Sequence, residues 1–313
     1  MPATLDGFLQ RIAENNTGLD ELSTLVPFMV ADVVVGHMKP KFAAELARFP
    51  DVFVTTASTS TSSSLDAQGG GAGLKSRPEL GLNLGLATLE SRTQAVAGVL
   101  AQLRGEGLIT GWRDELYPVT PSYYAAPLML VERAAATHFG IKAYGVHVNG
   151  FVRHQDGSHS LWVARRSISK PNWPGKLDHL VAGGQPHGLS PTENVVKECW
   201  EEAGVAAHLA DAARPVGVVS YRTVSATGLK PDVLFVYDLE LPEDFKPQAQ
   251  DGEVEQFMLW PVSKVAEVVS NTTEFKTNCN LVIIDWLVRH GYITPEQPGY
   301  LDVVKGLRQG DCS

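Results

Sequence analysis

Residues 190–205, SPTENVVKECWEEAGV, carry start and stop signals for a single helix and so constrain the fold around them. Ser190 can cap the helix, Pro191 suits its first position, and Glu193 completes a capping box. Gly204 stands where helices commonly end in a left-handed residue. At about 100° per residue, one side of this helix is apolar and comprises Val195, Val196, Cys199, Trp200 and Ala203. The segment therefore predicts an amphipathic helix that is anchored to a hydrophobic core.

The other side of this predicted helix gathers the carboxylates of Glu198, Glu201 and Glu202. Like charges at this spacing repel, and no lysine or arginine lies four residues after any of the three. A solvated acidic face is the ordinary interpretation of such a pattern. However, the preceding loop AGGQPHG contains glycines and brings backbone carbonyls near the helix start. Carboxylates, a carbonyl and water are ligands of Mg²⁺ or Mn²⁺, so the pattern also predicts an ion that binds phosphate oxygens.

Composition and charge limit the classes of function. The 313 residues are 44% hydrophobic and 19% charged, which is typical of a soluble globular protein with one large domain or two. A net charge of −9 lacks the basic footprint of nucleic-acid binding, and no apolar run is long enough to span a membrane. Three widely spaced cysteines (Cys199, Cys279 and Cys312) favour a reducing compartment. We therefore expect a cytoplasmic protein, and a short organellar leader stays open.

A change in the sequence pattern near residue 138 divides the chain into two predicted domains. Residues 1–138 mix strand-like and helix-like runs and predict an α+β domain, which includes a helix over LMLVERAAATHF ended at Gly140. A Ser/Thr/Gly-rich stretch at 55–77 is interpreted as a flexible insertion. Its GGGAGLKS departs from the phosphate-loop pattern because Leu74 separates the last glycine from the lysine. Residues 139–313 contain strand-like runs, a hairpin signal at 156–157 and strong helices, and predict an α/β layered domain.

With its preceding loop, the glutamate helix resembles the Nudix box, G-x5-E-x7-R-E-U-x-E-E-x-G-U, where U is a bulky aliphatic residue. KECWEEAGV matches the second half, with Lys197 at the arginine position and Gly204 at the final glycine. Gly183 and Gly184 correspond to the usual glycine pair, which leaves the loop one residue short. The first glutamate of the pattern falls on Leu189, which cannot ligate a metal.

Further segments, among them FLQRIAENN, GWRDELYPV, ERAAATHFGI and KPNWPGKLDHLVAGG, resemble one Nudix branch. Its members carry an additional N-terminal domain, and in some fungi the unit is fused to thiamine pyrophosphokinase. The resemblance implies a Nudix α/β/α sandwich with a mixed sheet after a smaller α+β domain. It also implies metal-dependent hydrolysis of thiamine diphosphate and its oxidised analogues to monophosphate plus phosphate, a repair of damaged metabolites. The resemblance also implies that Leu189 and Lys197 are traits shared by this branch.

The resemblance assigns a role to each box residue. Glu201 and Glu202 would be direct ligands of Mg²⁺ or Mn²⁺, and Glu198 a third ligand or the base that orients the attacking water. Lys197 would take the structural role of the arginine, as a point charge rather than a planar fork. A backbone carbonyl near Ala182 or Gly183 would complete the set of ligands. Cys199, on the apolar side, is interpreted as a core residue rather than a nucleophile.

Candidate residues also lie outside the box. Many Nudix enzymes recruit one more carboxylate after it, and of the acidic residues in DGEVEQF we prefer Glu253; a charged strand edge is the alternative. Before the box, Arg165, Arg166 and Lys170 form a local excess of positive charge that suits a diphosphate, although exposed strand charges are common. Trp173 either presents an aromatic face to a heterocycle or thiazolium cation, or packs in the core.

Three remaining features have ordinary interpretations. His147 and His187 are expected near the site as packed or surface residues, and GWRDE at 111–115 offers no mechanism by itself. Two alternatives for function stay open: a Nudix hydrolase of another diphosphate, such as a nucleoside diphosphate derivative, or a non-catalytic diphosphate-binding module. The intact carboxylate cluster argues against the module. The predicted partner is a small-molecule diphosphate, without nucleic acid or membrane, and the oligomeric state is not predicted.

Overall fold

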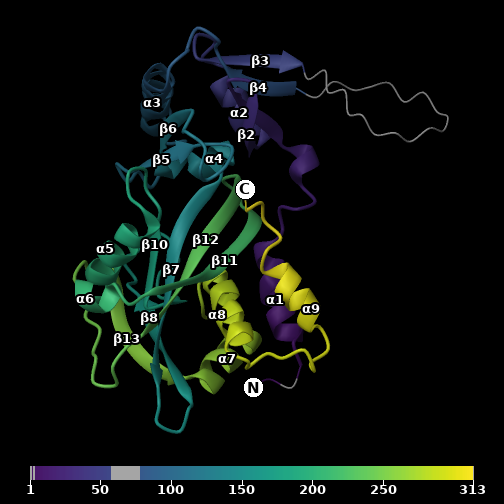
Figure 1. The fold of residues 1–313 in the computed structure, drawn as a ribbon. Helices are drawn as coiled ribbons and strands as arrows, with labels where there is room; N and C mark the ends of the chain where they lie inside the picture. The colour runs from purple at the N-terminus through teal and green to yellow at the C-terminus, as the bar shows by residue number, and fades with distance from the viewer. Residues whose placement is uncertain (1, 3, 58–77, 313) are drawn as a thin grey trace, which may run out of the picture. The chain divides into compact units, whose positions relative to one another are not determined.

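The computed structural model describes residues 2, 4–57 and 78–312 and divides the chain into two compact units (Figure 1). The C-terminal unit comprises Met1–Leu19, Ala143–Thr223 and Pro231–Ser313, and the N-terminal unit comprises Asp20–Lys142 and Val224–Lys230. This division differs from the predicted boundary at 138 in two respects, since Val224–Lys230 belongs to the N-terminal unit and the first helix does not. The first helix belongs to the C-terminal unit, because Phe8 and Ile12 are buried in the core of that unit.

The N-terminal unit contains a four-stranded sheet in the order β2-β1-β4-β3. Its strands are β1 (Val26–Val30), β2 (Val33–Met38), β3 (Phe53–Ala57) and β4 (Pro78–Leu82). A second, two-stranded sheet joins β5 (Leu116–Val119) to β6 (Met129–Glu132). The helical elements are η1 (Leu22–Thr24), α2 (Pro40–Leu46), α3 (Leu89–Gly105), η2 (Arg133–Ala135) and α4 (Ala136–Phe139).

Two predictions for this unit need correction. The predicted helix over LMLVERAAATHF begins as strand β6, because Met129 and Val131 alternate into the core while their backbone pairs with β5; only its end is helical, and it stops at Gly140 as expected. In the predicted insertion at 55–77, the first three residues belong to β3. The rest of the insertion, including GGGAGLKS, lies outside the described residues.

The C-terminal unit is built on a seven-stranded mixed sheet with the order β11-β12-β7-β8-β13, in which β10 also pairs with β7 and β9 with β8. The strands are β7 (Ala143–Arg153), β8 (His159–Arg166), β9 (Leu177–Asp178), β10 (Val181–Gly184), β11 (Arg214–Val224), β12 (Leu229–Glu240) and β13 (Val254–Pro261). The pair β12–β7 is parallel, whereas β7–β8 is antiparallel. The predicted hairpin between β7 and β8 is therefore confirmed.

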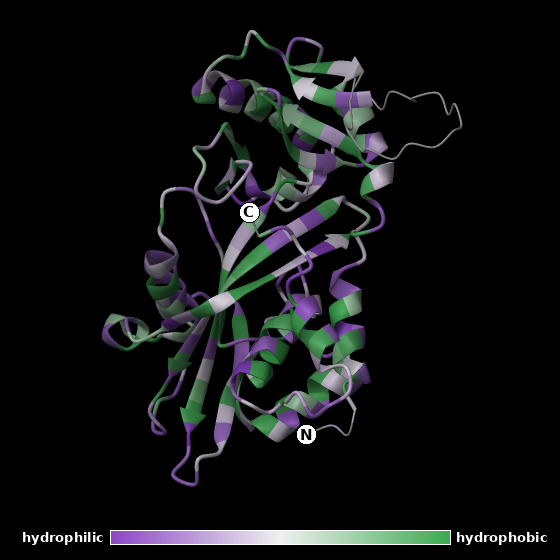
Figure 2. Ribbon diagram, turned by 45° about the vertical axis from the view of Figure 1, so that its right-hand side comes forward, coloured by the Kyte–Doolittle hydropathy of each residue, from purple (hydrophilic) through white to green (hydrophobic). Residues whose placement is uncertain are grey.

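Helices cover both faces of this sheet (Figures 1 and 2). One face packs against α1 (Asp6–Asn15), α7 (Val262–Asn271), α8 (Thr277–Arg289) and α9 (Tyr300–Gly306); the other packs against α5 (Pro191–Ala203) and α6 (Ala207–Ala210). Alternation along β8 explains the two cores, since Leu161 and Val163 enter the first and Trp162 the second. This arrangement confirms the predicted α/β/α sandwich. Among the helices of the described chain, none is long and apolar enough to cross a membrane.

Candidate active site

Helix α5 forms where the local signals predict it. The Ser190 hydroxyl accepts a hydrogen bond from the Glu193 amide (3.2 Å), and the Glu193 carboxylate accepts one from the Ser190 amide (2.9 Å), so the predicted capping box is present. Gly204 ends the helix in a left-handed conformation with φ 63°. Because the whole helix is fixed at both ends, the direction of each glutamate is determined by its place on the helix.

The apolar side of α5 is narrower than predicted. Cys199 and Ala203 are fully buried, but Trp200 is 55% exposed, so its assignment to the core is wrong. Trp200 stands about 100° around the helix from Cys199, beyond the reach of the core. Glu202 stands only about 60° from Cys199 on the opposite side. The core therefore draws Glu202 inward and leaves Trp200 at the surface.

The three carboxylates occupy different environments around strand β10. Glu202 accepts a hydrogen bond from the Ala182 amide (2.8 Å), and only 15% of the Glu198 side chain is exposed. Glu198 lies directly against Gly183, where an added Cβ would stand 2.4 Å from the carboxyl carbon. Glu201 is more open, with 45% of its side chain exposed. The helix thus places the carboxylates of Glu198 and Glu202 against the backbone of strand β10, near the carbonyl that was predicted to be a metal ligand.

Lys197 offsets part of the repulsion between these carboxylates. Its ammonium donates to the carboxylates of Glu201 (2.7 Å) and Glu198 (3.1 Å). The sequence pattern did not predict this contact. It considered only cations four residues after each glutamate, whereas Lys197 lies four residues before Glu201. Lysine before glutamate is the less favourable order on an exposed helix, so this contact should add little to the stability of the helix itself.

Glu202 is the most strongly perturbed of the three. Burial and the nearby charges of Asp178 and Glu198 raise the pKa of Glu202 to about 8, against the opposing effects of the Ala182 amide and Lys276. Burial and the nearby charges of Glu202 and Glu198 raise the pKa of the Cys199 thiol to about 12, so this thiol stays protonated and unreactive near neutral pH. A cation beside Glu202 would stabilise the ionised form of its carboxylate, as a bound metal ion does for its carboxylate ligands.

A buried ion-pair network around Asp178 supports this region, and the sequence did not predict it. The carboxylate of Asp178 accepts from the Arg166 guanidinium (2.7 Å), lies 3.6 Å from the Lys276 ammonium and accepts from the Cys279 thiol (2.8 Å). Burial would raise the pKa of Asp178, but Lys276 and Arg166 hold it well below the usual range. The sequence signal for this network was Asp178 itself, a charged residue within the apolar segment KLDHL, which forms a short buried strand.

The predicted substrate-binding residues lie on and around the loop at 167–176. Arg166 donates to the carbonyls of Asn172 and Trp173 as well as to Asp178, and Arg165 donates to the Gly175 carbonyl (2.9 Å). Both arginines are therefore engaged in holding the loop. Trp173 is 42% exposed at φ 55°, so the loop presents its ring outward rather than packing it in the core.

The predicted carboxylate Glu253 forms an ion pair with the predicted phosphate ligand Lys170. The backbone carbonyl of Glu253 also accepts from the Ser167 amide (2.9 Å). The start of β13 is thereby joined to the loop at 167–176. In this arrangement the two charges compensate each other.

The loop before α5 is fixed by amide side chains. Gln185 donates to the Leu189 carbonyl (2.6 Å), and Asn194 donates to the Gly184 carbonyl (2.7 Å). His187 in this loop is exposed, while His147 on β7 is buried with its ring edge-on to that of His179 at 5.0 Å. Both histidines therefore have the ordinary placements that the sequence suggested.

The fold and this site define a class of α/β/α enzyme that presents carboxylates from one capped helix. Residues 143–279 match the family model of the NUDIX domain, and residues 7–143 match a domain of unknown function (DUF4743). The chain is 49% identical over 309 residues to Nudix hydrolase 24, chloroplastic, of Arabidopsis thaliana, which covers 99% of this chain and 80% of that protein.

Two further relatives agree. Nudix hydrolase 20, chloroplastic, of the same plant is 49% identical over 309 residues, covering 99% of this chain and 79% of the relative. An uncharacterized protein of Saccharomyces cerevisiae is 40% identical over 215 residues, covering 64% of this chain and 62% of that protein. The chain belongs to the Nudix hydrolase family. It is accordingly an enzyme of a family that hydrolyses pyrophosphate bonds in small molecules, generally with divalent metal ions.

Proposed function

We propose that this enzyme hydrolyses thiamine diphosphate, and preferentially its oxidised analogues, to the monophosphate and phosphate. The observation that supports this chemistry is the set of three carboxylates on α5, two of which contact the backbone of strand β10. The choice of a thiamine substrate rests on the resemblance of segments such as GWRDELYPV and KPNWPGKLDHLVAGG to the thiamine-related branch.

The donor set fits Mg²⁺ or Mn²⁺. Carboxylate oxygens suit these hard cations, and a divalent ion beside Glu202 would offset the burial and the neighbouring charges of Asp178 and Glu198 that raise its pKa. Glu198, Glu201 and Glu202 would hold the ion together with a carbonyl near Ala182 or Gly183. When bound, the ion supplies charge neutralisation of the diphosphate and activation of a water.

The chain's own residues have distinct tasks in this proposal. The Ala182 amide orients Glu202 through its hydrogen bond, and Gly183 leaves room for the Glu198 carboxylate. Lys197 holds Glu201 and Glu198 at a fixed spacing. Glu198 would be the third ligand or the base that orients the attacking water, since it is held both against the strand and by the lysine.

Substrate binding is assigned to the loop at 167–176 and its neighbours. Trp173, exposed at its tip, would contact the heterocycle, and the positive charge of Arg165 and Arg166 would favour the diphosphate. Lys170 and Glu253 would act together: if Glu253 turns toward the metal as a further ligand, the Lys170 ammonium is released for a phosphate oxygen. We also propose that the N-terminal unit is a separate domain and that the enzyme is cytoplasmic; the names of both plant relatives place those proteins in the chloroplast.

The test is release of inorganic phosphate with Mg²⁺ or Mn²⁺ from thiamine diphosphate, oxothiamine diphosphate, ADP-ribose and NADH, each with and without EDTA. A phosphatase is added for the last two, because their cleavage liberates no free phosphate. We expect metal-dependent release that is fastest for oxothiamine diphosphate. Activity on the two nucleotides alone would retain pyrophosphate hydrolysis and refute the thiamine substrate. Bound metal without activity on any of the four would likewise refute it.

A further inference from the structure

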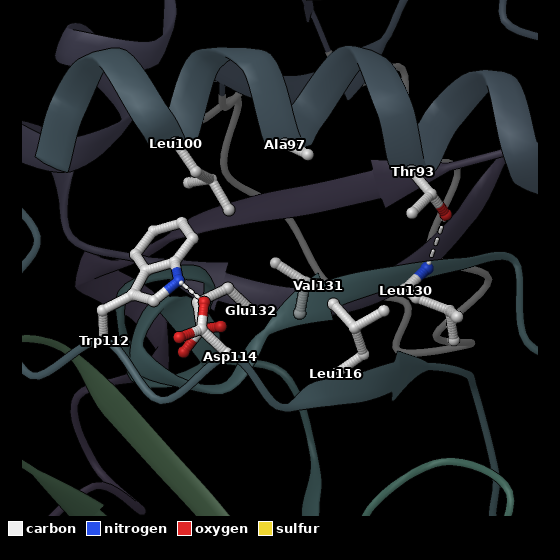
Figure 3. A pocket seen from close by; sticks show the side chains of 9 residues that line it. All are labelled: Thr93, Ala97, Leu100, Trp112, Asp114, Leu116, Leu130, Val131 and Glu132. Carbon is white, nitrogen blue, oxygen red and sulfur yellow. Dashed lines mark hydrogen bonds between the residues drawn. The ribbon is translucent and has the colours of Figure 1, made fainter.

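The N-terminal unit contains a pocket of about 240 Å³, lined mainly by helix α3 and strands β5 and β6 (Figure 3). The indole N–H of Trp112 donates to the exposed Asp114 (2.8 Å), and the Arg104 guanidinium lies over the Trp112 ring, 4.8 Å from its centroid. The buried Glu132 accepts from two backbone amides. The polar groups of this pocket are thus satisfied within the chain or by water.

A different cluster, in the C-terminal unit, brings together three side chains that can ligate a metal. His147 lies on β7, His179 directly follows β9, and Cys279 lies in the first turn of α8. A ring nitrogen of each histidine and the cysteine sulfur all lie within 4.8 Å of one another. Each of the three residues is at most 3% exposed. The proposed hydrolysis assigns none of these side chains a role.

His179 has a buried ring nitrogen whose hydrogen-bonding capacity is not used. Its Nε2 forms no hydrogen bond with any part of the chain that the structure describes. Burial lowers the pKa of the imidazole to about 4, so the ring is neutral near neutral pH. A neutral imidazole with its proton on Nδ1 presents a lone pair at Nε2, the form in which histidine ligates a metal. Because a buried polar atom without a partner is destabilising, this nitrogen points to a ligand that the protein itself does not supply.

Cys279 can supply a negative charge to a metal site. Its thiol donates to Asp178 (2.8 Å), whose other carboxylate oxygen contacts Arg166 and Lys276. Burial and the charge of Asp178 raise the pKa of the thiol well above its usual value, so the thiol keeps its proton while no metal is bound. A coordinated metal ion replaces that proton, which passes to the solvent as the sulfur–metal bond forms. The first turn of α8 favours the resulting thiolate, since the helix dipole is positive at that end.

We propose that His147, His179 and Cys279 bind one Zn²⁺ ion. Two imidazoles and a thiolate are a donor set for Zn²⁺, whereas Mg²⁺ and Mn²⁺ prefer oxygen ligands. Three atoms within 4.8 Å of one another fit around one ion, because each moves by less than about 1 Å to reach Zn–N and Zn–S distances of about 2.0–2.3 Å. The thiolate offsets one charge of the ion, and the Asp178 carboxylate beside the sulfur offsets part of the other.

The ion would connect segments that are distant in the sequence. Strands β7 and β9 belong to the mixed sheet, and α8 packs against one face of it. The unfolded chain does not bring these ligands together, so binding would stabilise the folded state. We therefore assign the ion a structural role. The inference is independent of the proposed hydrolysis, because it uses none of the carboxylates of α5, and its tests measure binding and stability rather than turnover.

The first test is titration of the metal-free full chain with Co²⁺, which substitutes for Zn²⁺ and reports its ligands by absorption. We expect a thiolate-to-cobalt charge-transfer band that saturates at 1:1 stoichiometry and disappears when Zn²⁺ is added. Excess Mg²⁺, which suits the carboxylates of α5, should not remove the band. Absence of the band, or its loss on adding Mg²⁺, would overturn the proposal.

The variant Cys279→Ser tests the sulfur ligand. A serine hydroxyl can still donate to Asp178, so the variant should fold, which a thermal melt checks, and it should lose the charge-transfer band. Cys312→Ser, which changes the exposed cysteine, is the control and should keep the band. A band retained in Cys279→Ser would assign it to another thiol and refute the site.

His179→Gln tests a second ligand by a different readout. Saturating Zn²⁺ should raise the melting temperature of the wild type by about 5 °C or more over that in EDTA. In His179→Gln the Zn²⁺ affinity, measured by competition with a chromogenic chelator, should fall at least about tenfold, and the thermal shift should shrink with it. His208→Gln, at an exposed position of α6, should behave as the wild type. Equal Zn²⁺ affinity of His179→Gln and the wild type would contradict the proposed ligand set.

Discussion

Each unit of this chain gathers carboxylates, and the two clusters are balanced in different ways. In the C-terminal unit, Lys197 bridges Glu198 and Glu201, and the buried Asp178 contacts two cations. In the N-terminal unit, the carboxylate of Glu132 accepts only backbone N–H groups among the residues that the structure describes. The first cluster lies against a glycine strand, and the second lies beside leucine side chains. The surroundings of a carboxylate, rather than its residue type, thus determine how its charge is balanced.

Among the variants that test this contrast, Asp178→Asn should have the largest effect, a loss of stability. The change leaves Arg166 and Lys276 without their buried anion, and breaking such a network costs about 3–5 kcal/mol of the free energy of unfolding. Urea denaturation at neutral pH measures this loss. Asp244→Asn, at an exposed position of the same unit, should change stability little. Near-equal stability of the two variants would show that ion pairing does not hold this region.

The same variant predicts a dependence on pH. Lys276 and Arg166 hold the pKa of Asp178 below its unfolded value of about 3.9. Its ionised form therefore contributes stability that is fully present above that pH and is lost progressively as the pH falls below it. The difference in unfolding free energy between the wild type and Asp178→Asn should be constant around neutral pH and shrink below about pH 4. A constant difference down to pH 3 would contradict the assigned charge.

Glu202→Gln should keep the fold and lower turnover by about 10²-fold or more, because it removes a charge proposed to hold the metal. Glutamine can still accept the hydrogen bond from the Ala182 amide, so stability should not fall. Phosphate release at saturating metal and substrate gives the turnover. Glu267→Gln, on the exposed side of α7, provides the control and should behave as the wild type. Near-normal turnover of Glu202→Gln would remove Glu202 from the ligand set.

Gly183→Ala tests the close approach of Glu198 to β10. The added methyl group would lie 2.4 Å from the Glu198 carboxyl carbon, so the carboxylate must move. We expect a loss of activity of about tenfold, since small displacements of a reacting group are costly, together with a higher metal requirement. Gly98→Ala, with open space around the added group, should leave both unchanged. Unaltered metal requirement in Gly183→Ala would indicate that Glu198 is not a ligand.

Local signals in the sequence were sufficient for helix α5, because its caps and its glycine stop act within a few residues of the helix ends. The hairpin of β7 and β8 was predicted for the same reason. The exposure of Trp200 could not be predicted from periodicity, which gives an angle but not the width of the core. The Asp178–Lys276 contact joins β9 to the start of α8, so only the tertiary fold reveals it. The site was thus predictable where it is a helix and not where it depends on distant partners.

The smallest effect is expected for Glu132→Gln, and it sharpens the contrast with Asp178. The glutamine carbonyl can still accept from the Arg113 and Ala134 amides, so the variant keeps both hydrogen bonds and removes only a charge that no cation balances in the described structure. The free energy of unfolding should change by no more than about 1 kcal/mol. Urea denaturation beside the exposed control Glu21→Gln measures this. A loss comparable to that of Asp178→Asn would mean that the Glu132 charge stabilises the fold, and the two clusters would then be balanced alike.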